Sequence, residues 1–142
     1  MTFLKKILLV DYQPRITALV RRALEAEGNY LIKHERDYRC AVNTARFFQP
    51  DLVLFDLEMS RPKARAVARE LEHDPLLVNT PVVYLSVNPS CADTVMSAGI
   101  LSGYSFMADP VRIEEFVRYV GELLKVPAEL LKSGYRAALQ TR

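Results

Sequence analysis

The chain has 142 residues, of which 50% are hydrophobic and 25% are charged, as expected for one domain that buries its own core. Its net charge of +2 is far from the basic excess of a nucleic-acid surface, and no signal-peptide pattern or run of about 18 apolar residues indicates a membrane protein. Cys40 and Cys91 lack metal-ligand spacing, so we expect a cytoplasmic protein with free thiols and neither nucleic-acid nor membrane partners.

The first half of the sequence alternates short apolar runs with segments of helical periodicity. Apolar runs of about four residues are typical of strands that are buried on both faces of a parallel sheet. Gly28 and Pro50 follow the two helical segments, and both residue types commonly end helices. In chain order we predict a strand at Ile7 to Val10, a helix over Ile16 to Leu24, a strand at Tyr30 to Lys33, a helix over Ala41 to Phe48 and a strand at Leu52 to Phe55.

The second half continues this alternation, and Val126-Pro127 interrupts the helical pattern near its end. In chain order we predict a helix over Ala64 to Leu71, a strand at Val82 to Leu85, a helix over Ser90 to Ala98, a strand at Tyr104 to Met107, a helix over Ile113 to Leu124 and a further helix over Ala128 to Leu139. The predicted organisation is therefore one domain over residues 1–125 and a C-terminal helical extension over residues 126–142.

Strands and helices that alternate with short connections predict an open, doubly wound parallel sheet with helices on both faces. The expected fold is a three-layer α/β sandwich with a five-stranded parallel sheet. The carboxyl ends of parallel strands lie at one edge of such a sheet, where ligands bind. Asp11, Asp56, Ser86 and Asp109 each follow a predicted strand or lie just beyond its end. We therefore expect three carboxylates and a hydroxyl to meet at this edge.

Four segments of the sequence resemble a known family in their order and spacing. They are residues 5–11 (KKILLVD), 50–59 (PDLVLFDLEM), 80–86 (TPVVYLS) and 109–110 (DP). Together they resemble the successive signatures of response-regulator receiver domains of two-component signalling systems, over roughly residues 4 to 125. The resemblance implies a flavodoxin-like receiver fold with strand order 2-1-3-4-5. It also implies a phosphorelay signalling protein and not an enzyme.

The resemblance further implies roles for the residues at the carboxyl edge. Asp56 matches the phosphoacceptor, which in the family takes a phosphoryl group from a histidine kinase. Ser86 matches the hydroxyl that binds the phosphate and shifts on activation. Phe106 matches the aromatic switch residue, with Tyr104 as a second candidate. These groups suit phosphoryl transfer, which needs a fixed acceptor oxygen and donors for the phosphoryl oxygens.

The cofactor that the resemblance implies is Mg²⁺, with Asp11, Asp56 and the backbone carbonyl of Glu58 as ligands. Two departures from the family pattern weaken this site. Tyr12 stands where the family has a second, metal-binding acid, and Asp109 stands where it has a lysine. An aspartate in place of a lysine changes the local charge by about two units and repels a dianionic phosphate. The alternative is that Asp109 replaces the missing acid as an oxygen ligand of the metal.

Three hypotheses of function follow from these observations. The first is a pseudo-receiver with impaired phosphorylation that works through protein–protein interaction. The second is a working receiver that a histidine kinase phosphorylates on Asp56. The third is a ligand-binding or enzymatic domain on the same topology, since a fold does not fix a function. The sequence contains none of the glycine-rich motifs of nucleotide sites, so the third hypothesis has no motif in its favour.

The expected partners are proteins: a histidine kinase, a phosphotransfer protein or an output protein. In the family, the face formed by the fourth helix, the fifth strand and the fifth helix carries partner contacts, so we expect homodimerisation through that face. His34 and His73 are isolated in the sequence, and we assign neither of them a role.

Overall fold

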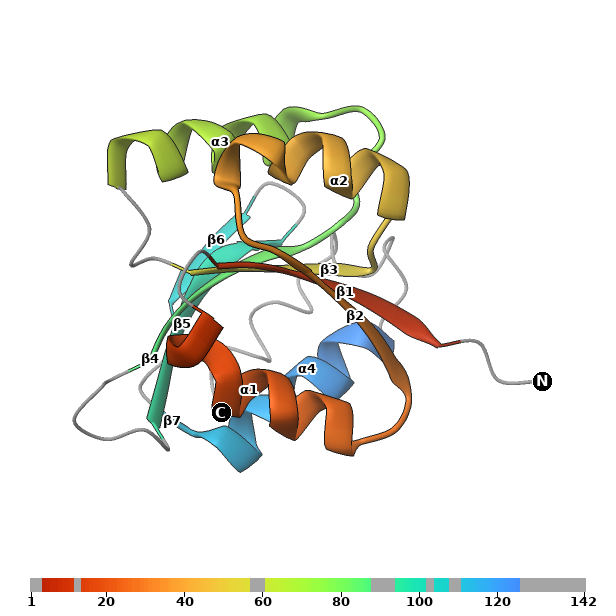
Figure 1. Ribbon diagram of the computed structural model, residues 1–142, viewed down its shortest axis with the longest axis vertical. Helices are drawn as coiled ribbons and strands as arrows, with labels where there is room; N and C mark the ends of the chain where they lie inside the picture. Colours follow the sequence, from red (N-terminus) through yellow and green to blue (C-terminus); the bar gives the residue numbers. More distant parts are fainter. Residues whose placement is uncertain are drawn as a thin grey trace.

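The computed structural model describes residues 4–11, 14–56, 61–87, 94–101, 104–107 and 111–125, which form a mixed α/β fold of three layers. Figure 1 shows a central sheet with α2 and α3 on one face and α1 and α4 on the other. The elements in chain order are β1 (Lys5–Val10), α1 (Pro14–Ala26), β2 (Tyr30–Glu35), the 3₁₀ helix η1 (Tyr38–Cys40), α2 (Ala41–Phe48), β3 (Leu52–Asp56), α3 (Arg61–His73), β4 (Val82–Val87), β5 (Thr94–Leu101), β6 (Tyr104–Met107), β7 (Val111–Arg112) and α4 (Ile113–Lys125).

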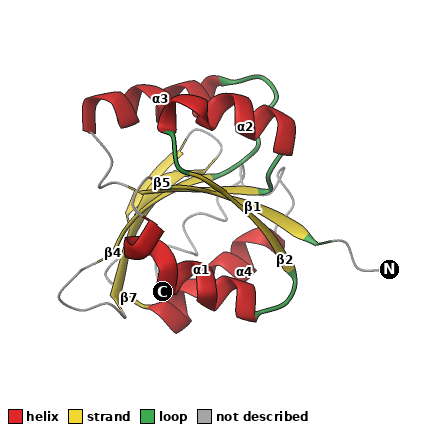
Figure 2. Cartoon of the chain, in the orientation of Figure 1, coloured by secondary structure: helices red, strands yellow, loops and turns green. Residues whose placement is uncertain are grey.

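Four of the strands form a parallel sheet in the order β2-β1-β3-β4. Residue Ile7 of β1 pairs with Ile32 of β2 and with Leu52 of β3, and Val53 of β3 pairs with Val82 of β4. The strands are joined through α1, α2 and α3, which Figure 2 shows on the two faces of the sheet. The predicted parallel, flavodoxin-like arrangement is therefore confirmed for these four strands.

The helices of this parallel half end where the sequence predicts that they end. Gly28 adopts a φ of 77°, a left-handed conformation that glycine tolerates at no steric cost, and its N–H donates to the carbonyl of Glu25 at 3.0 Å. Gln49 is also left-handed, with a φ of 51°, and its N–H donates to Ala45 at 2.7 Å. These turns allow the chain to leave α1 and α2 and return to the sheet.

The apolar runs on the strands are buried on both faces because successive side chains point to opposite sides of the sheet. On one side, residues such as Ile7, Leu54 and Leu85 pack with α1 and α4. On the other side, residues such as Leu8 and Phe55 pack with α2 and α3. Each strand therefore contributes to two separate hydrophobic clusters, which is why its sequence reads as a continuous apolar run.

The part of the sheet beyond β4 differs from the prediction. Residues 94–98 of the segment predicted as a helix over Ser90 to Ala98 instead belong to β5, which is antiparallel to β4, and residues 90–93 lie outside the described residues. The prediction was wrong because β5 has the sequence TVMSAGIL, whose β-branched residues favour a strand and whose glycine disfavours a helix. The strand expected at Tyr104 to Met107 does form, as β6.

The insertion of β5 changes the topology that the sequence predicts. The strand β6 pairs with β5 and not with β4, so the observed order is β2-β1-β3-β4-β5-β6, with β7 also paired to β5. The parallel part of the sheet therefore has four strands and not five. The helix expected over Ala128 to Leu139 lies outside the described residues. Among the described helices, none is long and apolar enough to cross a membrane.

Candidate functional site

The carboxyl edge of the parallel sheet brings two buried carboxylates together. Asp11 directly follows β1, Asp56 is the last residue of β3, and both are fully buried. Val10 pairs with Phe55 on the neighbouring strand, so Asp11 and Asp56 are the next residues of two adjacent strands, which lie about 4.8 Å apart. The register of the two strands therefore places the backbones of these two acids side by side, as the sequence predicts.

The third strand of this edge supplies the predicted hydroxyl residue. Asp56 pairs with Leu85 of β4, and Ser86 is the next residue along that strand. The backbones of Asp11, Asp56 and Ser86 therefore lie on three consecutive strands at one edge. The other predicted members of the site, Glu58 and Asp109, lie outside the described residues, as does Tyr12.

The candidate switch residues lie farther from this edge along the sheet. Phe106 pairs with Gly99 of β5, which in turn pairs with Val83 of β4. Tyr104 pairs with Leu101 of β5. The strand β5 therefore separates both aromatic positions from β4, and the backbone of Ser86 pairs with Met96 instead. The structure does not place Ser86 and Phe106 on neighbouring strands.

The main chain at Asp11 is held by the end of β2. The N–H of Asp11 donates to the carbonyl of Glu35 at 3.0 Å. The carbonyl of Asp11 lies 2.8 Å from Nε2 of His34, and since a carbonyl only accepts, Nε2 is the donor. His34 is 23 residues away in sequence, and no motif around it predicted a role. Only the pairing of β1 with β2 reveals this contact.

The side chain of Glu35 anchors the turn that follows β2. Its carboxylate accepts from Oγ1 of Thr44 on α2 at 2.5 Å and from the N–H of Asp37 at 3.1 Å. Asp37 in turn caps η1 by accepting from the N–H of Arg39 at 2.9 Å. Hydrogen bonds from Arg39 hold the pKa of Asp37 below its ordinary value. The edge beside Asp11 is therefore fixed by hydrogen bonds on the side of β2.

The chemistry of the edge favours a hard cation. Two carboxylates on adjacent strands repel each other, and oxygen ligands of this kind suit Mg²⁺ or Ca²⁺. Within the described residues, no group of three or more histidine, cysteine, aspartate or glutamate side chains could hold a metal ion. Asp11 and Asp56 therefore fit part of a magnesium site, and further ligands would have to come from the undescribed positions.

Comparisons with known proteins identify sequences and structures that are similar to this chain. The family model described as "Response regulator receiver domain" matches residues 7–120. The chain is 29% identical over 126 residues to the transcriptional regulatory protein TrcR of Mycobacterium tuberculosis, covering 88% of this chain and 47% of that protein. It is 30% identical over 138 residues to the DNA-binding response regulator MtrA of Mycolicibacterium smegmatis, covering 94% of this chain and 58% of that protein.

A further relative is the nisin biosynthesis regulatory protein NisR of Lactococcus lactis subsp. lactis, 25% identical over 120 residues, covering 84% of this chain and 50% of that protein. The chain thus spans about half the length of the curated relatives it matches. Among solved structures, a response regulator from Desulfuromonas acetoxidans superimposes with a TM-score of 0.51 and 28% identity, covering 58% of this chain and 66% of that chain.

Proposed function

The chain belongs to the family of response regulator receiver domains, and on that premise we propose that it is an atypical receiver in which phosphorylation of Asp56 is impaired. In this proposal the domain signals through contacts with protein partners. A histidine kinase, a phosphotransfer protein or an output protein would be such a partner in a two-component system. The names of TrcR and MtrA describe regulatory proteins, and those names give no support to an enzymatic role.

The observation that carries this proposal is the identity of residue 109. At the position where the resemblance to the family calls for a lysine, the chain has Asp109. Asp11 and Asp56 already form a pair of buried carboxylates, and an aspartyl phosphate carries about two negative charges where the Asp56 carboxylate carries one. Without the lysine, this charge has lost its usual counterion, and phosphorylation becomes less favourable.

Tyr12 supports the same proposal. It follows Asp11 at the position of the family's second metal-binding acid, and a neutral phenol does not replace a carboxylate as a ligand of Mg²⁺. Where bound, Mg²⁺ would neutralise part of the phosphoryl charge, and Asp11, Asp56 and the carbonyl of Glu58 would hold it. Asp109 would be the additional carboxylate if the metal still binds.

A second candidate function is a working phosphoacceptor. The specific observation in its favour is the register of the edge, because Asp11 and Asp56 end adjacent strands and Ser86 follows the residue that pairs with Asp56. This is the arrangement that an acceptor, a metal ligand and a phosphate-binding hydroxyl require. The two candidates differ in one observable, which is whether Asp56 becomes phosphorylated.

The test is intact-protein mass spectrometry after incubation with acetyl phosphate and Mg²⁺. We expect the native sequence to stay unmodified. The variant Tyr12→Asp/Asp109→Lys, which restores the family pattern, should gain the mass of one phosphoryl group. Adding Asp56→Asn to that variant should abolish the gain, and circular dichroism should show that all three proteins are folded.

Each outcome of this test separates the candidates. A phosphoryl mass on the native sequence that disappears in Asp56→Asn would overturn the proposal and establish the second function. If the restored variant also stays unmodified, the attribution of the defect to Tyr12 and Asp109 is wrong. Isothermal titration with Mg²⁺, Mn²⁺ and Ca²⁺ would then show whether Asp109 has rescued a metal site.

The sequence-based expectation of a homodimer needs revision. It relied on a face with a fourth helix, a fifth strand and a fifth helix, but the segment expected to form the fourth helix contributes to β5. The corresponding face is built from β5, β6 and α4. We propose that any contact through this face uses strand and helix surfaces together, and sedimentation of the full chain would show whether it dimerises.

A further inference from the structure

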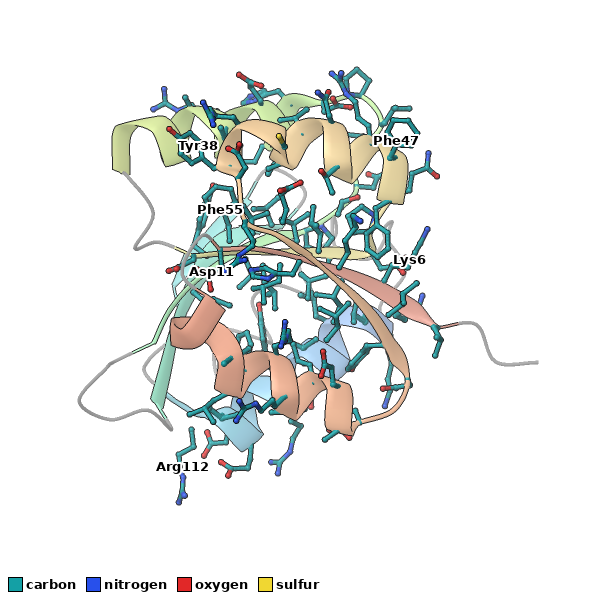
Figure 3. All side chains as sticks on the ribbon, in the orientation of Figure 1. Lys6, Asp11, Tyr38, Phe47, Phe55 and Arg112 are labelled. Atoms are coloured by element: carbon teal, nitrogen blue, oxygen red, sulfur yellow. The ribbon has the colours of Figure 1, made fainter. Side chains whose placement is uncertain are left out.

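Large apolar side chains are exposed at the end of α2 and on the loop between α3 and β4. Phe47 of α2 is 95% exposed, and Leu76 and Val78 of the loop are 63% and 53% exposed. We call these three residues the Phe47 patch. Figure 3 shows Phe47 on the outer side of the α2–α3 layer, directed away from the sheet. A phenylalanine this exposed contributes no buried area to the core. Exposed apolar side chains that cluster on a surface are typical of an interaction site.

The two segments of the patch are joined by direct contacts. Nε of Arg46 lies 2.6 Å from Oδ2 of Asp74, and Oγ1 of Thr80 donates to the carbonyl of Pro50 at 3.5 Å. The first contact joins α2 to the start of the loop, and the second joins the end of the loop to the turn after α2. Phe47, Leu76 and Val78 therefore belong to one region of the surface.

The loop that carries Leu76 and Val78 is held in a fixed shape. Oδ1 of Asp74 accepts from the N–H of Leu76 at 2.9 Å, and its carbonyl accepts from the N–H of Leu77 at 2.9 Å. Leu77 itself is buried in the cluster beneath α2 and α3. Because Leu77 points inward, its two neighbours are held outward, and a partner would meet a surface that is already ordered.

The border of the patch presents positive charge to solvent. In the pair of Arg46 and Asp74, the arginine side chain is 50% exposed, whereas the aspartate side chain is only 2% exposed. Nζ of Lys6 donates to the carbonyl of Phe48, the neighbour of Phe47, at 2.7 Å. The helix α2 has the sequence AVNTARFF and contains no acidic residue. The surface therefore has an apolar centre with the cations of Arg46 and Lys6 beside it, and the carboxylate of Asp51 accepts from the backbone N–H of Lys6 at 2.8 Å.

We propose that the Phe47 patch is a docking surface for a protein partner that presents an apolar pocket rimmed by carboxylates. Arg and aromatic residues are the side chains that most often dominate such interfaces. A second copy of the chain fits less well, because a symmetric contact through Phe47 would bring the two Arg46 side chains together. A nucleic acid fits less well because the centre of the patch is apolar. The proposal does not depend on phosphorylation of Asp56.

The test uses two designed helical peptides with leucines along one face, flanked by glutamates in one peptide and by lysines in the other. Each is titrated into the ¹⁵N-labelled full chain and followed by amide chemical shifts. We expect the glutamate peptide to change the amide chemical shifts of residues in α2 and in the 74–80 loop. The lysine peptide should bind about tenfold more weakly. Phe47→Ser should weaken binding of the glutamate peptide about tenfold.

The matched control is Leu19→Ser on α1, because Leu19 is also exposed and α1 covers the opposite face of the sheet. It should leave binding unchanged, and Leu76→Ser provides a second patch variant if Phe47→Ser does not fold. Shifts outside the patch, equal binding of the two peptides, or no binding would each overturn the proposal. So would stronger binding of duplex DNA or anionic vesicles at the patch, or self-association that Phe47→Ser abolishes.

Discussion

The two faces of the sheet are covered by helices in different ways. On the side of α1 and α4, the cluster consists of buried aliphatic residues and Phe116, which is fully buried. On the side of α2 and α3, alanines and leucines cover the strands, and polar contacts supplement them. These contacts join Thr44 to Glu35, Arg46 to Asp74 and Glu72 to Tyr84.

The difference has consequences for both stability and surface. A layer held by apolar burial depends little on pH, whereas a layer held partly by carboxylates weakens when those groups are protonated. The short helix α2 buries only Ala41 and Ala45 fully. The ring of Phe47 is exposed to solvent, so it contributes no buried apolar area to the core. The layer that relies on polar contacts is also the layer that presents the Phe47 patch.

The largest expected effect is on the α1–α4 face. Phe116→Ala should lower the free energy of unfolding by about 3–5 kcal/mol, because it removes a fully buried ring and leaves a cavity. Urea denaturation of the full chain measures this. Phe47→Ala makes the same chemical change at an exposed site and should change stability by less than about 0.5 kcal/mol. Equal losses in the two variants would contradict the assignment of Phe116 to the core.

The next effect is on the polar contact between α2 and the loop after α3. Arg46→Ala removes the guanidinium from the buried carboxylate of Asp74, which keeps only the N–H of Leu76 as a described partner. The loss should be smaller than for Phe116→Ala, because the arginine is half exposed and solvent replaces part of the interaction. Hydrogen exchange should increase in α2 and the 74–80 loop but not in α4. Equal increases in α4 would contradict the separation of the two faces.

Acid should weaken the α2–α3 face before the other one. The N–H of Leu76 and the guanidinium of Arg46 hold the pKa of Asp74 below its ordinary value. Its contribution to stability is therefore complete above about pH 4, the ordinary pKa of an unfolded aspartate, and is lost as the pH falls through the lower folded-state pKa. Asp74→Asn should flatten the acid limb of the stability curve.

The control for this acid effect is Asp37→Asn. Asp37 also has a lowered pKa through Arg39, but the Asp37–Arg39 pair is largely exposed to solvent. Its replacement should therefore change the acid limb less than Asp74→Asn does. Thermal melts between pH 3 and pH 6 would measure both variants. A larger change in Asp37→Asn would show that the buried pair is not the acid-sensitive contact.

How far the sequence predicts this fold depends on the half of the chain. Continuous apolar runs such as Ile7–Val10 and Leu52–Phe55 have one interpretation, because only a strand covered on both faces buries every residue. The segment that becomes β5 lacks a continuous apolar run, and the helix predicted there depended mainly on Val95 and Ala98. Its partner, β4, lies several residues away along the chain, and short-range patterns do not encode which strand pairs with it.

The candidate site shows the same limit. Asp11 and Asp56 could be predicted because each follows a clear strand, and parallel strands end at one edge. The contact between His34 and the carbonyl of Asp11 could not, because it depends on the register in which Leu9 pairs with His34. A histidine within a strand has no local signal for a partner 23 residues away. His34 lies beside the site because of the register between β1 and β2, and not because of its residue type.

The smallest expected effect again concerns the α2–α3 face. Oη of Tyr84 donates to the carboxylate of Glu72 at 2.7 Å, so Tyr84→Phe should lower the free energy of unfolding by about 1 kcal/mol. Burial first, and then Glu72, raise the pKa of Tyr84 above its ordinary value. Stability from this group is present below about pH 10 and falls at higher pH, because the unfolded chain loses the phenolic proton first.

Glu72→Gln distinguishes the hydrogen bond from the charge. The glutamine keeps an acceptor for the Tyr84 hydroxyl but removes the negative charge that opposes tyrosinate. It should therefore preserve most of the stability at neutral pH and make the decline above pH 10 shallower than in the native chain, since less of the pKa shift remains. If Glu72→Gln costs as much stability at neutral pH as Tyr84→Phe, the carboxylate charge and not the hydrogen bond joins α3 to β4.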